Sequence, residues 1–446
     1  MKQHTATFKG GIHPLYEKHW TQNLPIEEIP APTEVILPLS MHIGAPCQAL
    51  VKPGDTVHMG QLVAKANGFV SANIHASVSG IVKAVQPREA SGGKKIPSII
   101  IENDFKDTLD DGIYQHETDN ISGEEILQKI QAAGIVGMGG AAFPTHVKLS
   151  IPEGKTVDTV IINGAECEPY LTSDDLIMQT EPEKLLRGLH YILKVLNLSK
   201  GYIGVEDNKE KAISRLQQLE TSNAELFVLK TKYPQGSEKQ LIKAITGREV
   251  PSAGLPADIG VVVVNAASTC AVADAVEKGL PLIKRIATVT GSGIKSPKNV
   301  RFRIGTPVSQ ILHFCGGLTE NASKLIIGGP MMGIAQYTME IPAVKGTSGI
   351  LCLDKKEAAF TAPSNCIRCG KCAAACPMNL EPLYLSRYSE LKDFDKCESY
   401  NALDCMECGC CTYVCPAKRN IVSSIRVAKL QIQAKRMRKK EQEAES

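Results

Sequence analysis

The chain has 446 residues, of which 43% are hydrophobic and 22% are charged, and its formal net charge is only +3. This length is too great for one hydrophobic core and predicts about three or four globular domains. The nearly balanced charge, without a basic stripe interleaved with aromatic residues, excludes a nucleic-acid-binding protein.

The first predicted elements are short β-segments between residues 44 and 85. The run VKPGDTV, residues 51–57, is typical of a strand, a turn and a second strand. The stretch resembles the barrel-sandwich fold of lipoyl and biotinyl domains, and the shared turns are Gly54-Asp55, Gly60-Gln61 and Ser79-Gly80. Phe69 stands where those domains carry the modified lysine, so we expect a docking module without swinging-arm chemistry. A plain β-domain is the alternative.

A glycine-rich loop follows a predicted helix at residues 122–130. It reads GIVGMGGAAFPTHVK over residues 134–148. Glycines let backbone N–H groups approach a phosphate, and the start of a following helix would add its dipole. The loop therefore indicates a phosphate-bearing cofactor, although such a loop can also be a simple turn.

Four strand–helix units follow and predict a doubly wound sheet. Their opening segments begin at residues 157, 201, 233 and 260, and a helical pattern follows each of them. Polar residues such as Asn163, Glu206 and Asn265 lie where strands end, which is the edge at which open α/β sheets bind ligands.

Three segments of this region resemble the flavin-bearing, NADH-oxidising subunit of respiratory complex I. GMGGAAFPTHVK is similar to that family's GRGGAGFPTGLKW, NGAECEPYLTSDD to its NADEGEPGT, and YPQGSEKQLIKAI to its YICGEETALI. The resemblance implies FMN, with NADH stacked over the flavin. Departures at Met138, Ala165 and residues 236–238 weaken the NADH contacts more than FMN binding.

The same resemblance implies roles for individual residues, although no catalytic residue follows from it. The expected contacts to the flavin phosphate or ring edge are Gly137, Gly139, Gly140 and Lys148. Those to the ribityl chain and isoalloxazine are Asn163, Glu166 and Asn265. Phe143 could stack on the incoming nucleotide, and Glu206 could meet a ribose hydroxyl. The alternative for each is a turn or core residue.

The next region predicts strands and tight turns around one helix at residues 308–314. It resembles the soluble-ligand-binding β-grasp module that follows the flavin domain in the same protein of complex I. We expect a mechanical role for it, which is to space the flavin from the cysteine motifs.

Eight of the fifteen cysteines form two runs of the pattern C-x2-C-x2-C-x3-C-P. In bacterial two-cluster ferredoxins the fourth cysteine of each run ligates the other cluster. The sequence therefore predicts one [4Fe–4S] cluster on Cys366, Cys369, Cys372 and Cys415, and a second on Cys376, Cys405, Cys408 and Cys411. We expect Gly370 and Gly409, which follow the second cysteine of each run, to relieve backbone strain in the turn there. We also expect each fourth cysteine to begin a helix.

Zinc is the alternative for these cysteines, but zinc sites usually pair C-x2-C motifs across a long gap. Cys410 could compete with Cys411 as a ligand. The other cysteines are expected to be buried small side chains rather than disulfides. Residues 423–446 predict a basic, then acidic, helix that faces solvent or a partner.

The fold class is therefore multidomain α/β and α+β. We expect a barrel-sandwich domain at residues 1–115, an FMN/NAD-binding domain at 116–275, the β-grasp module at 276–349, the twin [4Fe–4S] domain at 350–425 and a charged tail at 426–446. This order resembles the C-subunit family of the Rnf complexes, bacterial ion-pumping ferredoxin–NAD⁺ oxidoreductases, and residues 9–14, KGGIHP, resemble the opening of that family's chains.

The resemblance implies a peripheral subunit at the cytoplasmic side of the cell membrane. Its partners would be NAD(H), membrane subunits that export Na⁺ or H⁺, and an iron–sulfur subunit that accepts electrons from ferredoxin. The longest apolar stretch, residues 259–267, is too short to span a membrane, and we expect no signal peptide. A soluble cobalamin reductase of bacterial microcompartments and a cluster-only electron-wire adaptor are the alternatives.

Overall fold

The computed structural model describes residues 6–219 and 222–445. The N-terminal part folds as two small antiparallel sheets with strand orders β2-β8-β7-β4 and β3-β5-β6. Their strands are β2 (Glu34–Pro38), β3 (Gln48–Ala49), β4 (Thr56–Val57), β5 (Leu62–Lys65), β6 (Ile74–His75), β7 (Gly80–Ala90) and β8 (Lys94–Asn103). Val35, Val63 and Ile101 share one apolar core. The predicted barrel sandwich is confirmed, and Phe69 lies 62% exposed between β5 and β6.

A parallel sheet of order β11-β10-β9-β12 forms the centre of the second domain. Its strands are β9 (Thr159–Gly164), β10 (Gly201–Glu206), β11 (Ala224–Leu229) and β12 (Val261–Asn265). Its helices are α1 (Gly123–Ala132), α2 (Thr145–Leu149), α3 (Ser173–Thr180), α4 (Pro182–Leu196), α5 (Glu210–Gln218), α6 (Glu238–Thr246) and α7 (Ala266–Lys278).

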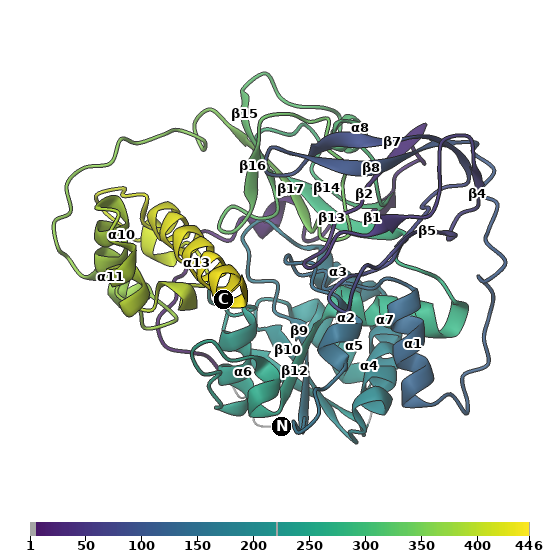
Figure 1. The fold of residues 1–446 in the computed structure, drawn as a ribbon, viewed down its shortest axis with the longest axis horizontal. Coiled ribbons are helices and arrows are strands. Elements are labelled where there is room, and N and C mark those ends of the chain that lie inside the picture. Colours follow the sequence, from purple (N-terminus) through teal and green to yellow (C-terminus); the bar gives the residue numbers. More distant parts are fainter. Residues whose placement is uncertain (1–5, 220–221, 446) are drawn as a thin grey trace.

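The side chains of this sheet alternate between two cores, because successive strand residues point to opposite faces. Val160 and Ile162 of β9 pack in the core that contains α4 and α7, whereas Ile161 packs in the core that contains α6. Helices therefore cover both faces of the sheet (Figure 1), and the predicted doubly wound domain is confirmed.

The third domain is a mixed sheet of order β1-β14-β13-β17-β15-β16 with α8 (Val308–Phe314). Its strands are β1 (Ile26–Glu28), β13 (Lys284–Thr290), β14 (Lys298–Arg303), β15 (Ala322–Ile327), β16 (Ile334–Gln336) and β17 (Gly349–Asp354). Helix α8 has the bounds expected from the sequence. The edge strand β1 comes from the N-terminal segment and pairs in parallel with β14, which the sequence did not indicate.

The C-terminal domain is helical and lies at the left of the molecule in Figure 1. It contains α9 (Lys371–Ala375), α10 (Pro382–Glu390), α11 (Phe394–Ser399), α12 (Cys410–Tyr413) and α13 (Ile421–Glu445). Ile421, Ile425 and Ile432 bury one side of α13 against this domain, so the expected charged tail continues a core helix. Within residues 6–219 and 222–445, no helix has the length and apolar character needed to cross a membrane.

The N-terminal segment joins the second and fourth domains. The Gly11 amide donates to the Ala375 carbonyl at 2.9 Å, and the Ile12 amide donates to the Tyr233 carbonyl at 2.8 Å. The KGGIHP segment therefore lies between the parallel-sheet domain and the cysteine-rich helices.

Candidate functional site

The glycine-rich loop doubles back on itself before α2. The Gly137 amide donates to the Phe143 carbonyl at 2.8 Å, and the Ser268 hydroxyl accepts from the Met138 amide at 2.8 Å. Gly139 and Gly140 are exposed beyond this turn. A side chain at Gly140 would meet no atom within 4 Å, and its φ is +133°. The loop therefore leaves the open backbone cradle that a flavin phosphate requires.

Three buried cations hold the loops around this cradle. The Arg285 guanidinium donates to the Met138 carbonyl at 2.7 Å, and the Lys345 ammonium donates to the Gly134 carbonyl at 2.6 Å. Lys18 donates to the carbonyls of Glu166 and Glu168 at 2.9 and 3.1 Å. Burial lowers the pKa of all three cations, that of Lys345 to about 7.

Sequence reasoning missed these cations, because a lone lysine or arginine outside a motif carries no signal. They come from the N-terminal segment and the β-grasp module, not from the parallel-sheet domain that they brace.

The polar residues at the carboxyl ends of the strands brace one another. Asn163 donates to the Gly236 carbonyl at 2.7 Å. The Glu166 carboxylate accepts from the Asp174 and Asp175 amides at 2.8 and 3.1 Å, which caps the start of α3. Asn265 caps α7 by accepting from the Ser268 amide and donates to Asp174 at 2.6 Å.

Two buried carboxylate oxygens in this group have no hydrogen-bond partner within the described residues, namely one oxygen each of Asp174 and Asp175. Burial raises the pKa of Asp174 to about 6, and the nearby charge of Glu166 adds to the rise. Buried acceptors without donors are rare in folded proteins. Together with the open glycine cradle they fit FMN, whose hydroxyl and ring N–H groups are donors.

Lys148, Phe143 and Glu206 differ in how well they suit their expected roles. Lys148 is part-buried and pairs with Glu238 at 2.6 Å, and Phe143 is half-buried in the glycine loop. Glu206 is fully buried, forms a 3.0 Å ion pair with Lys209 and accepts from the Lys232 amide. The Glu206 carboxylate thus has partners within the chain and braces the end of β10.

The structure groups the motif cysteines into two quartets around two separate cavities. Cys366, Cys369, Cys372 and Cys415 line the first cavity, and we call them the outer quartet. Cys376, Cys405, Cys408 and Cys411 line the second, and we call them the inner quartet. This is the crossed grouping that the spacing predicts. Cys410 also lines the second cavity, so a fifth thiol is present there.

The local geometry of the runs explains the crossing. Gly370 and Gly409 take left-handed φ values of +73° and +82° directly before α9 and α12. The expectation that each fourth cysteine begins a helix is wrong. Cys376 and Cys415 follow α9 and α12, so a short helical turn separates the third thiol from the fourth and directs them to different cavities.

The inner quartet adjoins the parallel-sheet domain, and the outer quartet reaches the surface. The Tyr233 hydroxyl donates to the Cys408 carbonyl at 2.8 Å, and Gln240 donates to the Pro377 carbonyl at 3.2 Å. Cys167 shares an apolar cluster with Cys408. Burial raises the pKa of the Cys405 thiol to about 11, so metal binding there must displace protons.

Within the described residues no group of three or more His, Cys, Asp or Glu side chains is arranged to hold a single metal ion.

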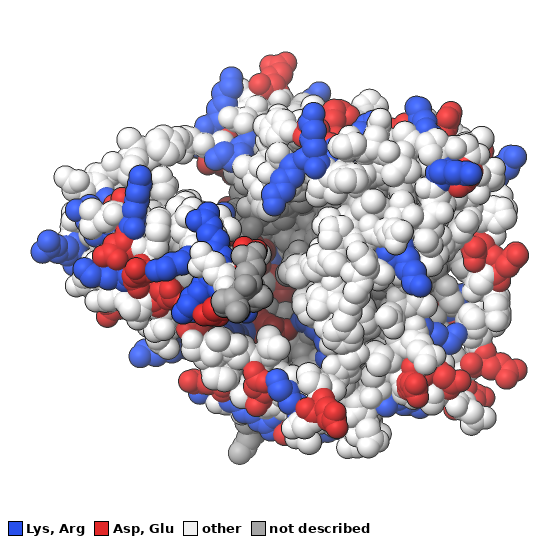
Figure 2. Space-filling view, in the orientation of Figure 1, with Lys and Arg blue, Asp and Glu red and all other residues white. Residues whose placement is uncertain are grey.

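Figure 2 shows one face of the molecule, which is hollowed at its centre between the C-terminal helices at the left and the larger body at the right.

Comparison with known proteins gives matches along most of the chain. The RnfC barrel sandwich hybrid domain matches residues 6–106, the Nuo51 FMN-binding domain 130–274, the SLBB domain 286–335 and the 4Fe-4S dicluster domain 359–435. The chain is 53% identical over 434 residues to the C subunit of the Na⁺-translocating ferredoxin:NAD⁺ oxidoreductase complex of Acetobacterium woodii, with 97% of this chain and 98% of that relative covered. This chain belongs to the RnfC family.

Other members of the RnfC family support the same assignment. The C subunit of the proton-translocating ferredoxin:NAD⁺ oxidoreductase complex of Clostridium ljungdahlii is 49% identical, with 97% of this chain and 96% of that relative covered.

Among solved structures, a chain of an NAD⁺-reducing [NiFe]-hydrogenase matches 70% of this chain and 63% of its own length at 18% identity, with a TM-score of 0.48.

Membership in the RnfC family confirms the predicted cofactor classes. The FMN-binding domain contains the glycine loop and the polar strand ends, and the dicluster domain contains both cysteine runs, which favours [4Fe–4S] clusters over zinc. An RnfC protein is part of an ion-translocating ferredoxin:NAD⁺ oxidoreductase. The individual ligand and contact residues stay predictions.

Proposed function

We propose that this RnfC protein binds FMN on the glycine loop, meets NAD(H) there, and relays electrons between that site and a partner subunit through its two cysteine quartets. When bound, FMN exchanges an electron pair with the nicotinamide and single electrons with [4Fe–4S] clusters. The observation that carries the proposal is the Tyr233–Cys408 hydrogen bond, which joins the flavin domain to the inner quartet.

The residues of the chain have distinct parts in this proposal. Gly140 leaves room for the flavin phosphate, Gly139 lies exposed beside it and close to Asn265, and Gly137 fixes the turn beneath them. Asn163, Glu166 and Asn265 hold the strand ends in position, and Lys148 lies beside them with its charge shared with Glu238. Phe143 is the proposed stacking residue for the nucleotide. Glu206 is left out of the contact set because it is buried and paired.

The two quartets are proposed to act in sequence. The inner quartet lies against the flavin domain, whereas Cys366 and Cys369 of the outer quartet are exposed and the intervening Ile367 is 67% exposed. Electron transfer slows steeply with distance, so a partner must approach the exposed quartet. We propose that this partner belongs to the iron–sulfur or membrane subunits of the complex, at the cytoplasmic side of the cell membrane.

The coupling ion belongs to those partners. The Acetobacterium woodii relative is named as Na⁺-translocating and the Clostridium ljungdahlii relative as proton-translocating, so membership in the family is compatible with either ion.

A comparison of two glycine variants tests the flavin part of the proposal. Gly140→Leu places a side chain in the open cradle, whereas Gly154→Leu places one where no atom lies within 4 Å, at a surface turn of the same domain with φ +80°. After reconstitution the parent should contain about eight iron atoms per chain, together with one FMN that NADH bleaches. Gly140→Leu should lose FMN and keep its iron, and Gly154→Leu should keep both.

The same preparation separates the rival functions. A parent chain that holds iron but no FMN, with a spectrum that NADH leaves unchanged, would establish the cluster-only adaptor. Copurification with integral membrane subunits supports the Rnf assignment, whereas copurification with microcompartment shell proteins would establish the cobalamin reductase.

A further inference from the structure

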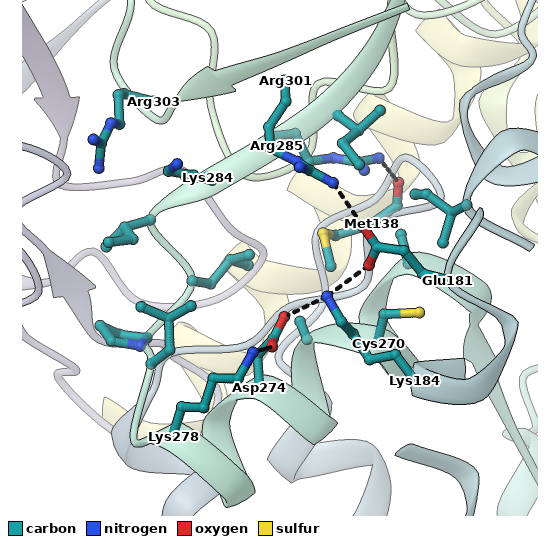
Figure 3. Close-up of a pocket in the computed structure, with 18 of the residues that line it drawn as sticks. Met138, Glu181, Lys184, Cys270, Asp274, Lys278, Lys284, Arg285, Arg301 and Arg303 are labelled. Atoms are coloured by element: carbon teal, nitrogen blue, oxygen red, sulfur yellow. Dashed lines mark hydrogen bonds and ion pairs between the residues drawn. The ribbon is translucent and has the colours of Figure 1, made fainter. Parts of the chain in front are cut away.

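A third cavity, distinct from those that the two cysteine quartets line, lies behind the proposed flavin cradle, where three domains meet (Figure 3). Its volume is about 380 Å³, which is within the range of small-molecule sites. Helices α3, α4 and α7, strands β13 and β14, and Met59 of the barrel sandwich form its walls. Met138 is the one residue among the described lining that also belongs to the glycine loop.

The lining of this cavity is rich in positive charge. Six basic side chains line it, namely Lys184, Lys278, Lys284, Arg285, Arg301 and Arg303, against two acidic ones, Glu181 and Asp274. Two further acids pair with this set from outside the lining, Glu28 with Lys284 and Arg301, and Asp107 with Arg303. Lys184 and Lys278 pair with the two acids of the lining itself, so five of the six cations have an ion pair. Arg285 has no ion pair among the described residues, although the charges of Asp174 and Glu166 act on it.

Two buried guanidinium groups in the wall have donors that the chain does not satisfy. Arg285 is 2% exposed, and its Nε has no partner within the described residues. Arg303 is 8% exposed, and one of its terminal nitrogens meets only the thioether sulfur of Met59, which is a weak acceptor. Unsatisfied buried donors are costly, so both groups indicate an acceptor in the cavity.

The rest of the wall is apolar. It consists of small and aliphatic side chains that include Ile177, Ala267, Ala271, Leu282 and Ile286. A free inorganic anion would leave this surface uncovered, whereas an organic group would cover it.

We propose that this cavity binds an organic phosphate of the size of a nucleoside monophosphate. Phosphate oxygens are the strong acceptors that the Nε of Arg285 lacks and that the Met59 sulfur replaces only weakly at Arg303. The phosphate accepts from the guanidinium groups and from Lys278 and Lys284, and the organic part covers α7. Arg285 also holds the Met138 carbonyl, so the ligand would bind directly behind the glycine loop.

Calorimetric titration of the full chain, loaded with FMN and iron and with NAD⁺ in excess, tests this proposal with three probes: AMP, adenosine and inorganic phosphate. AMP should bind at least about tenfold more tightly than adenosine or inorganic phosphate, because only AMP satisfies both parts of the wall. Adenosine or inorganic phosphate binding as tightly as AMP, or no binding of AMP, would overturn it.

Two lysine variants locate the site. Lys284 lies in β13, is half-exposed and pairs with Glu28, whereas Lys83 in β7 is more exposed and pairs with Glu34. Lys284→Ala should weaken AMP binding about tenfold, the usual effect of losing one charged hydrogen bond, and Lys83→Ala should leave it unchanged. Equal effects of the two substitutions would place AMP elsewhere and overturn the proposal.

Discussion

Gly10 is the position at which the N-terminal segment most directly supports the inner quartet. Its φ is +80°, and an added Cβ would lie 2.7 Å from the Cys376 carbonyl oxygen and 3.0 Å from the carbonyl carbon. Backbone atoms cannot rotate away as a flexible side chain can, so Gly10→Ala must shift either the segment or Cys376.

The cost of this substitution has two parts. An alanine in the left-handed region costs roughly 1–2 kcal/mol, and overpacking against the Cys376 backbone adds about 1–3 kcal/mol. Gly247, at the end of α6, has a φ of +73° with no atom within 4 Å of the added Cβ. Gly247→Ala therefore carries the first part without the second, and the difference between the variants isolates the contact with Cys376.

Iron release during denaturant unfolding under anaerobic conditions measures the difference. Gly10→Ala should release about half of its iron at lower denaturant than the parent, because one of the two clusters loses its support. Gly247→Ala should release its iron as the parent does. Equal iron release by the two variants would refute the role of the KGGIHP segment.

Two further substitutions test the buried charges around the glycine loop. Lys345 has a pKa near 7 when folded and near 10.5 when unfolded, so the unfolded chain binds more protons between these values and stability rises with pH across that window. Lys345→Met should remove this rise. In urea unfolding between pH 7 and 9, the free energy of unfolding of the parent minus that of the variant should grow by up to about 1.4 kcal/mol per pH unit. A difference that does not change with pH would contradict the burial of the charge. Glu166→Gln keeps the size of the side chain that caps α3 but removes its charge. It should lower the free energy of unfolding by about 1–2 kcal/mol and raise the FMN dissociation constant. An FMN affinity equal to that of the parent would show that the α3 cap does not support the site.

Local sequence patterns predicted much of this molecule because their physical causes are local. The paired cysteine runs, the strand–helix alternation from residue 157 onward and the turns of the barrel sandwich depend on spacing within a few residues. The grouping of Cys376 with the Cys405 run followed from the fixed spacing alone, although the helix was expected after the fourth cysteine and lies before it.

Contacts between distant segments could not be predicted in this way. Lys18 of the N-terminal segment donates to the Glu166 carbonyl, and Lys345 of the β-grasp module donates to the Gly134 carbonyl. Burial of a lysine is decided by the tertiary fold, and neither lysine stands in a recognisable motif. The ligand contact of Glu206 stays a prediction, because its place at a strand end suggested the contact while the fold pairs its carboxylate with Lys209.

The relay from an exposed outer quartet through an inner quartet to the flavin domain is the central claim. Cys376→Ala tests it most directly in the assembled complex, with ferredoxin as donor, because the substitution removes one thiol of the inner quartet. Cys397→Ala is the control, since Cys397 is a fully buried cysteine of the same domain outside both quartets.

The measurement is NAD⁺ reduction driven by reduced ferredoxin, alongside bleaching of the flavin by NADH. The account predicts that Cys376→Ala abolishes the first and retains the second, while Cys397→Ala retains both. Ferredoxin-driven NAD⁺ reduction at the parental rate in Cys376→Ala would contradict it.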